Sequence, residues 1–165
     1  LDKIGRNYLK FWTAERKAKA AKQSMTQAQI ITLASIVEEE TNIPEDKLKI
    51  ASTYMNRIHL GMPLQADPTL KFAVNDFTLR RLLTVHTQVN SPYNTYVHAG
   101  LPPGPICTPS MKTIDAVLDA PKTTYLYFCA REDFKGYSNF ASTYAEHQQN
   151  ARRYQAALNA RGIKK

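Results

Sequence analysis

Hydrophobic residues recur at helical spacing in two adjacent segments, residues 26–40 and 44–60. Thr26 followed by Gln29 is a capping-box pattern, which predicts that the first helix begins there. Pro44 suits the first turn of the second helix, and Gly61 suits its end. One broad face of the first helix is apolar, at Ile30, Leu33, Ala34, Ile36 and Val37. We expect the two helices to pack as a hairpin, with the acidic end of the first near the connection.

The first 24 residues are polar and rich in Lys and Ala, which predicts one peripheral helix. The apolar anchors that we expect for this helix are Leu9, Phe11 and Trp12. We therefore divide the chain into a basic helical lead-in, residues 1–25, and a globular domain, residues 26–162.

Residues 61–107 are punctuated by Gly and Pro, which favour turns over long elements. Short helices are expected at residues 68–74 and 77–83. Residues 90–107 are predicted to form a structured loop, because their tyrosines and a leucine give them apolar surface to bury.

The last third of the chain mixes helical and strand patterns. Residues 108–109, Thr-Pro, should cap and begin a helix whose inward residues are Met111, Ile114, Val117 and Leu118. Residues 123–130 have the β-branched and aromatic enrichment of a buried strand, and residues 137–140 should pair with them as an antiparallel hairpin. A second capping box opens a final helix over residues 143–161. The predicted fold class is α+β, a single domain with helices packed around a small antiparallel sheet.

Composition narrows the function classes. The chain carries a formal charge of +8, which favours anionic partners such as nucleic acid, acidic lipids or anionic cell-wall glycans. It has no nucleic-acid recognition motif, no apolar stretch long enough to span a bilayer, and no zinc, phosphate-loop or Ser/His/Asp pattern. Because it begins with Leu1 and shows no signal peptide, we expect a fragment of a longer protein. Cys107 and Cys129 are compatible with one disulfide or with two free thiols.

Three consecutive acids end the first amphipathic helix. At about 100° per residue, Glu39 points away from the apolar face, whereas Glu38 and Glu40 lie on its two flanks. A carboxyl group beside apolar neighbours should have a raised pKa, as a general acid requires. Residues two apart on a helix do not face each other, so the two flanking acids cannot form the facing pair of an ordinary glycosidase. A plain charged helix end remains the alternative interpretation.

Two loops carry the residue types of a glycan-binding cleft, namely amides, carboxylates and aromatic rings. Gln65 and Asp67 lie in the first loop, and Tyr93, Asn94 and Tyr96 lie in the second. The alternatives are that Asp67 only caps a short helix and that the second loop serves turn bonding and packing. For His147, in the first turn of the last helix, the alternative is a surface or capping residue.

Ordered motifs make the chain resemble the YceG-like, or MltG, family of endolytic murein transglycosylases. They begin with Ala34-Ser-Ile-Val-Glu-Glu-Glu-Thr41, Asn56-Arg57 and Gly61-Met-Pro-Leu-Gln-Ala-Asp-Pro-Thr69. They continue with Ser91-Pro-Tyr-Asn-Thr-Tyr96, Gly100-Leu-Pro-Pro-Gly-Pro-Ile106, Tyr125-Leu-Tyr-Phe128 and Glu146-His147. The motifs lie within residues 31–150, which leaves the two basic ends outside the resemblance.

The resemblance implies a peptidoglycan lytic transglycosylase without a cofactor or metal. Such an enzyme cleaves the β-1,4 bond between N-acetylmuramic acid and N-acetylglucosamine in nascent strands, leaves 1,6-anhydro ends and so terminates elongation. It implies Glu38, the first Glu of the family motif, as the single acid/base. Glu40 would support it, and the substrate-binding or supporting residues would be Gln65, Asp67, Tyr93, Asn94, Tyr96 and His147. Glu38→Gln is expected to abolish anhydro-ended products.

The family pattern is not matched everywhere, and other functions stay open. Glu39, Gln148 and Cys107 replace residues more common in the family.

Two alternative functions remain. One is a hydrolytic muramidase that uses Asp67 or Glu40, and the other is a non-catalytic peptidoglycan-binding scaffold. The expected partners are glycan strands and the cell-wall synthesis machinery, with no nucleic acid. The expected setting is the extracytoplasmic side of the bacterial inner membrane, through an anchor absent from this chain, and the expected state is a monomer.

Overall fold

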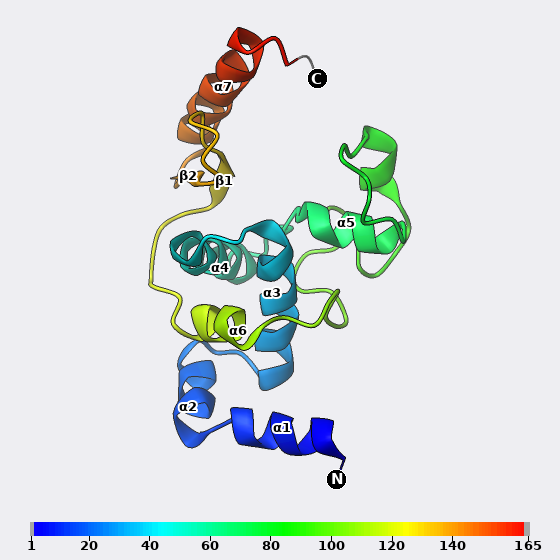
Figure 1. Ribbon diagram of the computed structural model, residues 1–165, viewed down its shortest axis with the longest axis vertical. Coiled ribbons are helices and arrows are strands. Elements are labelled where there is room, and N and C mark those ends of the chain that lie inside the picture. Colours follow the sequence, from blue (N-terminus) through cyan, green and yellow to red (C-terminus); the bar gives the residue numbers. More distant parts are fainter. Residues whose placement is uncertain (1, 164–165) are drawn as a thin grey trace.

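A computed structural model describes residues 2–163. Two helices, α3 (Gln27–Glu40) and α4 (Pro44–His59), lie at the centre, and α6 (Met111–Leu118) packs against both. Helices α1 (Lys3–Phe11) and α2 (Ala14–Lys22) lie at one end of the molecule. The hairpin of β1 (Tyr127–Ala130) and β2 (Ser138–Ala141) lies at the other end with α7 (Tyr144–Ala160) (Figure 1). This is the predicted α+β class.

Local capping explains where the central helices begin and end. Thr26 accepts a hydrogen bond from the backbone N–H of Gln29, whose side chain accepts one from the N–H of Thr26, as predicted. Pro44 occupies the first turn of α4. Gly61 follows that helix with a φ of +68°, which a glycine adopts without steric cost.

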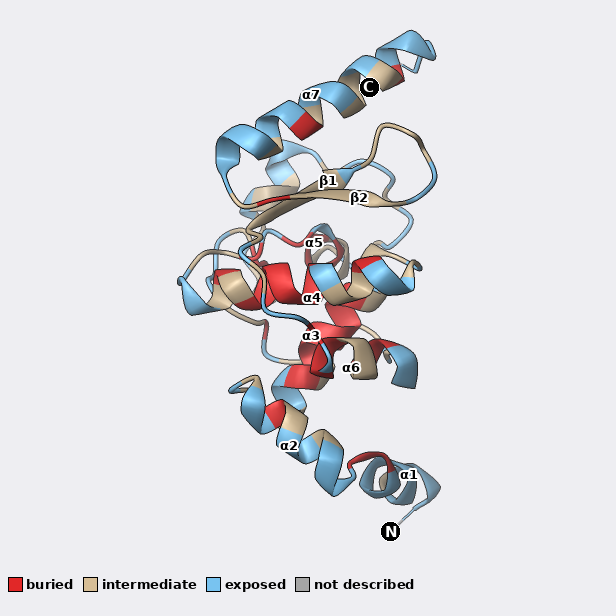
Figure 2. Cartoon of the chain, turned by 90° about the vertical axis from the view of Figure 1, so that its left-hand side faces the viewer, coloured by how far each residue is buried: buried red, intermediate tan, exposed pale blue. Residues whose placement is uncertain are grey.

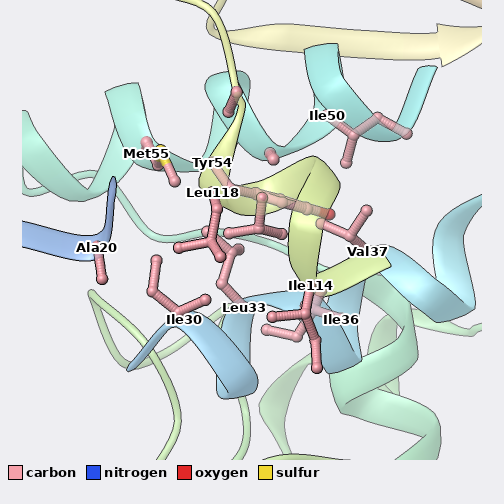
Figure 3. Close-up of a cluster of buried hydrophobic side chains, with 14 of the residues drawn as sticks. Ala20, Ile30, Leu33, Ile36, Val37, Ile50, Tyr54, Met55, Ile114 and Leu118 are labelled. Atoms are coloured by element: carbon pink, nitrogen blue, oxygen red, sulfur yellow. The ribbon is translucent and has the colours of Figure 1, made fainter. Parts of the chain in front are cut away.

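The apolar face of α3 is buried as its periodicity predicts. Ile30, Leu33, Ile36 and Val37 have no exposed surface, and they pack among residues of α4 and α6 (Figure 3). Figure 2 shows the same concentration of buried residues in α3, α4 and α6. Each fully buried aliphatic side chain contributes roughly 1.5–3 kcal/mol through the hydrophobic effect, so this cluster fixes the platform that carries the acids.

The prediction of one helix over residues 1–24 is wrong, because α1 and α2 are separate helices. Thr13 accepts a hydrogen bond from the N–H of Arg16 and so caps a new helix. Phe11 and Trp12 at the break are buried as predicted, whereas Leu9 is 59% exposed and anchors nothing. Within residues 2–163, no helix is long and apolar enough to cross a membrane.

The middle of the chain follows the predictions in part. Helix α5 (Asp67–Ala73) and the structured loop over residues 90–107 are present. A helix over residues 77–83 is absent, because Asp76 accepts bonds from Thr78 in a tight turn, and the helical turn η1 (Thr84–Gln88) follows instead.

The C-terminal elements also differ in their bounds. Helix α6 begins after Ser110, which caps it, instead of at Pro109, and Met111 is 62% exposed although it was expected to face inward. In the hairpin Phe128 pairs with Phe140. The strand β1 is shorter than the predicted 123–130 and only half-buried. It begins at Tyr127 because the carbonyls of Thr123, Tyr125 and Leu126 accept bonds from side chains of α4. The second capping box, at the start of α7, is confirmed.

Candidate active site

The three acids at the end of α3 point to different surroundings. Glu39 is exposed, as predicted. Glu38 faces α6 and α4, and Glu40 faces a cleft between the helical core and the β1–β2 hairpin. The helix therefore separates three adjacent carboxyl groups into three environments.

Glu38 belongs to a charged cluster that links three helices. Its Oε2 accepts hydrogen bonds from Lys47 Nζ at 3.1 Å, from the hydroxyl of Thr113 and, at 3.4 Å, from the hydroxyl of Ser110. Burial on its own would raise the pKa of Glu38, but the bonds from Thr113 and Lys47 and the charge of Lys47 outweigh it and lower the pKa below its usual value. The prediction of a raised pKa at Glu38 is wrong for this reason.

Glu40 has the raised pKa that the sequence argument assigned to a flanking acid. Burial raises the pKa of Glu40 to about 7, the hydroxyl of Tyr54 lowers it through a 2.5 Å hydrogen bond, and the negative charge of Asp67 raises it. Glu40 is also the last residue of α3, where the helix dipole disfavours a negative charge. A carboxyl group with this pKa holds and releases a proton near neutral pH.

The cleft has a volume of about 290 Å³ and collects side chains from distant parts of the chain. Five of the predicted site residues line it: Glu40, Gln65, Asp67, Tyr96 and His147. The hydroxyl of Tyr96 donates to Asp67, which joins the loop to the start of α5. Gln65 is held in the left-handed backbone region, with φ of +52°, while its N–H donates to the carbonyl of Thr95. The two predicted loops thus meet at one wall.

Two predicted cleft residues lie elsewhere. Asn94 is fully buried, donates to the carbonyls of Thr87 and Val89, and accepts from the N–H of Tyr96, so it lies inside the loop and not on the cleft surface. Tyr93 does not line the cleft, because its ring packs against Phe72 with centroids 4.7 Å apart. Both residues shape the loop that carries Tyr96.

The cleft lining also contains residues that were not assigned from the sequence, among them Arg57 and Tyr127. Arg57 of α4 is 7% exposed and donates to the carbonyls of Leu126 and Pro63 at 2.6 and 2.7 Å. Its guanidinium lies 5.1 Å from the centre of the Tyr127 ring, and His147 stacks on that ring at 5.1 Å. Burial, followed by the charge of Arg57, lowers the pKa of His147. The Asn56-Arg57 motif in the sequence could have indicated this role for Arg57. A buried Arg needs acceptors at fixed positions, so it often holds neighbouring segments in place.

The cleft continues past the acid into a second cavity of about 510 Å³ along the hairpin. Glu40, Asp67 and Phe128 line both cavities, so the carboxyl group of Glu40 lies where they meet. Aromatic rings in the second cavity come from Phe134, Tyr137 and Tyr154, the last on α7. An extended ligand can therefore contact protein on both sides of Glu40.

The arrangement suits general acid/base chemistry on a polar, ring-containing polymer. It offers one carboxyl group near neutral pKa, hydroxyl and amide groups for hydrogen bonds, and aromatic faces. Among residues 2–163 there is no group of three His, Cys, Asp or Glu placed to hold a metal ion. Cys107 and Cys129 are both free thiols in the structure.

Comparison with known proteins defines the family. Residues 1–153 match the model of the YceG-like family. The chain is 38% identical over 143 residues to a protein of Bacillus subtilis named endolytic murein transglycosylase, covering 87% of this chain and 39% of that protein. A protein of the same name from Streptococcus pneumoniae is 32% identical over 132 residues, covering 78% of this chain and 24% of that protein.

A solved structure agrees with these matches. The crystal structure of a YceG-like protein from Listeria monocytogenes superimposes with a TM-score of 0.72 at 35% sequence identity, covering 82% of this chain and 43% of that one. The chain belongs to the YceG-like family. It spans less than half the length of these relatives. The family match includes α1 and α2, which lie outside the stretch that carries the sequence motifs.

Proposed function

We propose that this domain is an endolytic peptidoglycan transglycosylase, with Glu40 as its acid/base. The observation that carries the proposal is a single carboxyl group of pKa about 7 at the junction of two cavities, in a member of the YceG-like family. Relatives named endolytic murein transglycosylase support the same activity. The assignment differs from the one implied by the family resemblance, which was Glu38.

The proposed reaction needs one carboxyl group in two successive roles. Protonated Glu40 donates its proton to the oxygen that joins N-acetylmuramic acid to N-acetylglucosamine, and the bond from that oxygen to the anomeric carbon breaks. The 6-hydroxyl oxygen of the same muramic acid residue then bonds to the anomeric carbon while its proton passes to Glu40. The products are a 1,6-anhydro end and a free 4-hydroxyl, and no water is consumed.

In this route only one carboxyl group has to react, although Asp67 lines the same cavities as Glu40. An ordinary glycosidase uses its second carboxylate to activate water or to attack the sugar, whereas here the nucleophile belongs to the substrate. Asp67 is held by the hydroxyl of Tyr96, and its negative charge favours the protonated form of Glu40. Because the first step needs the protonated acid, the rate should fall as pH rises through about 7.

The pair Glu40→Gln and Glu38→Gln tests the assignment on defined glycan strands. We expect Glu40→Gln to lose anhydro-ended products and Glu38→Gln to retain them. The opposite result would restore the sequence-based assignment to Glu38. Circular dichroism on both variants checks that the fold is intact.

Mass spectrometry of the products separates the proposed reaction from its alternatives. A hydrolytic muramidase yields ends heavier by one water than anhydro ends, and a binding scaffold yields no new ends but retains glycan affinity. Action on the extracytoplasmic side of the inner membrane, contact with the cell-wall synthesis machinery and a monomeric state remain predictions for the full-length protein.

A further inference from the structure

Tyr54 is the one side chain that holds the carboxyl group of Glu40 within the described chain. It comes from the middle of α4, is 2% exposed, and its hydroxyl donates to Glu40 Oε1 at 2.5 Å. No other hydrogen-bond donor among residues 2–163 contacts either oxygen of Glu40. Oε1 is thus held by Tyr54, and no donor among the described residues occupies Oε2.

The ring of Tyr54 is itself fixed by its neighbours. Phe128 of β1 packs edge-on against it, with centroids 5.7 Å apart and planes at 83°. Burial, followed by the nearby charge of Glu40, raises the pKa of Tyr54 well above its usual value, so the hydroxyl stays protonated and acts only as a donor. Tyr54 also lines the cleft, but at 2% exposure it offers a glycan little surface.

We infer that Tyr54 is a positioning residue, which orients the carboxyl group of Glu40 so that Oε2 carries the catalytic proton. The inference rests on the proposed function and adds a residue that the sequence motifs did not assign. A glutamate side chain at a helix end has three rotatable bonds, and one bond to a rigid ring removes most of that freedom. The hydroxyl also favours the ionised form, which allows the same group to act as a base after it has acted as an acid.

Other charged and titratable groups face the same carboxyl group. Asp67 and Lys71 of α5 act on its pKa in opposite directions, the aspartate raising it and the lysine lowering it. The remaining titratable groups lining the two cavities are Arg57, Tyr96, Tyr127, Cys129, Arg131, Tyr137, Tyr144, His147 and Tyr154. Among the described residues, only the hydroxyl of Tyr54 makes a hydrogen bond to the carboxyl group of Glu40. Removal of this hydroxyl therefore changes the orientation of that carboxyl group as well as its pKa.

The variant Tyr54→Phe isolates this hydroxyl, because the ring and its contact with Phe128 remain. We expect kcat on defined glycan strands to fall roughly five- to tenfold, as one hydrogen bond is worth about 1 kcal/mol, while KM stays unchanged. We also expect the alkaline limb of the pH–rate profile to move upward, because the bond that lowers the pKa of Glu40 is lost. Tyr8→Phe is the matched control, since Tyr8 lies on α1, away from the cleft, and its hydroxyl donates to Gln27.

The result is interpreted together with Glu40→Gln. If Glu40→Gln is inactive and Tyr54→Phe keeps the wild-type kcat and pH profile, the positioning role is overturned while the proposed function stands. If Glu40→Gln is fully active, the proposed function fails.

Discussion

The charged cluster of Glu38, Lys47 and Thr113 should stabilise the fold without taking part in catalysis. The side chains of Glu38 and Lys47 are only 27% and 13% exposed, so their interaction is weakly screened by solvent. Glu38→Gln keeps the shape and removes the charge. We expect the free energy of unfolding to fall by about 1–2 kcal/mol, the usual range for a hydrogen bond to a charged group after partial compensation.

The pH dependence of this loss follows from the lowered pKa of Glu38. A carboxyl group whose pKa is lower in the folded state stabilises that state above its unfolded pKa of about 4.5. The difference between wild type and Glu38→Gln should therefore be complete at neutral pH. It should disappear as the pH falls through the lowered pKa of the folded protein.

Thermal and urea unfolding across this pH range would measure the effect. For a domain of 165 residues, the expected loss lowers Tm by about 2–8 °C at neutral pH. Glu39→Gln is the matched control, because that side chain is exposed and should change stability by less than about 0.5 kcal/mol. Equal stability of the two variants, or a loss at Glu38 that persists unchanged in acid, would refute the argument.

Three further substitutions test the packing around the site. Leu33→Ala should cost about 3–5 kcal/mol in urea unfolding, because the fully buried leucine leaves a cavity in the core. Asn94→Ala should lower the free energy of unfolding by about 1–3 kcal/mol, because buried backbone groups lose their partner. The loop that carries Tyr96 should also loosen, which limited proteolysis would detect as new cleavage near residue 90. Gly136→Ala should cost about 1 kcal/mol by thermal unfolding, since the turn requires a φ of +86°; an unchanged Tm would contradict this.

The sequence predicted the elements whose causes are local. Thr26 and Pro44 mark the starts of helices because a cap or a fixed φ acts within one turn. The break at Thr13 was missed because the Lys- and Ala-rich residues on both sides favour helix, while the burial of Phe11 and Trp12 depends on distant partners.

The sequence predicted which loops carry the residues of the site, but it could not predict how their side chains are arranged in space. Periodicity placed Glu38 and Glu40 on opposite flanks, but it could not say which flank meets a lysine and which meets a tyrosine. Those partners lie 9 and 14 residues away on α4, and the orientation of that helix decides between them. The sequence could not place Asn94 inside its loop, because the same amide chemistry that suits a sugar also satisfies buried backbone groups.

The bonds between α4 and the segment before β1 bear on how this cleft can vary. Asn56 donates to the carbonyls of Thr123 and Tyr125, and Arg57 to that of Leu126. Each of these acceptors is a main-chain oxygen, which every amino acid possesses. Substitution of Thr123, Tyr125 or Leu126 therefore leaves these acceptors in place. Substitution of Asn56 or Arg57 removes the donors. The hairpin side of the cleft can therefore change its surface chemistry while α4 keeps hold of the chain segment that leads into it.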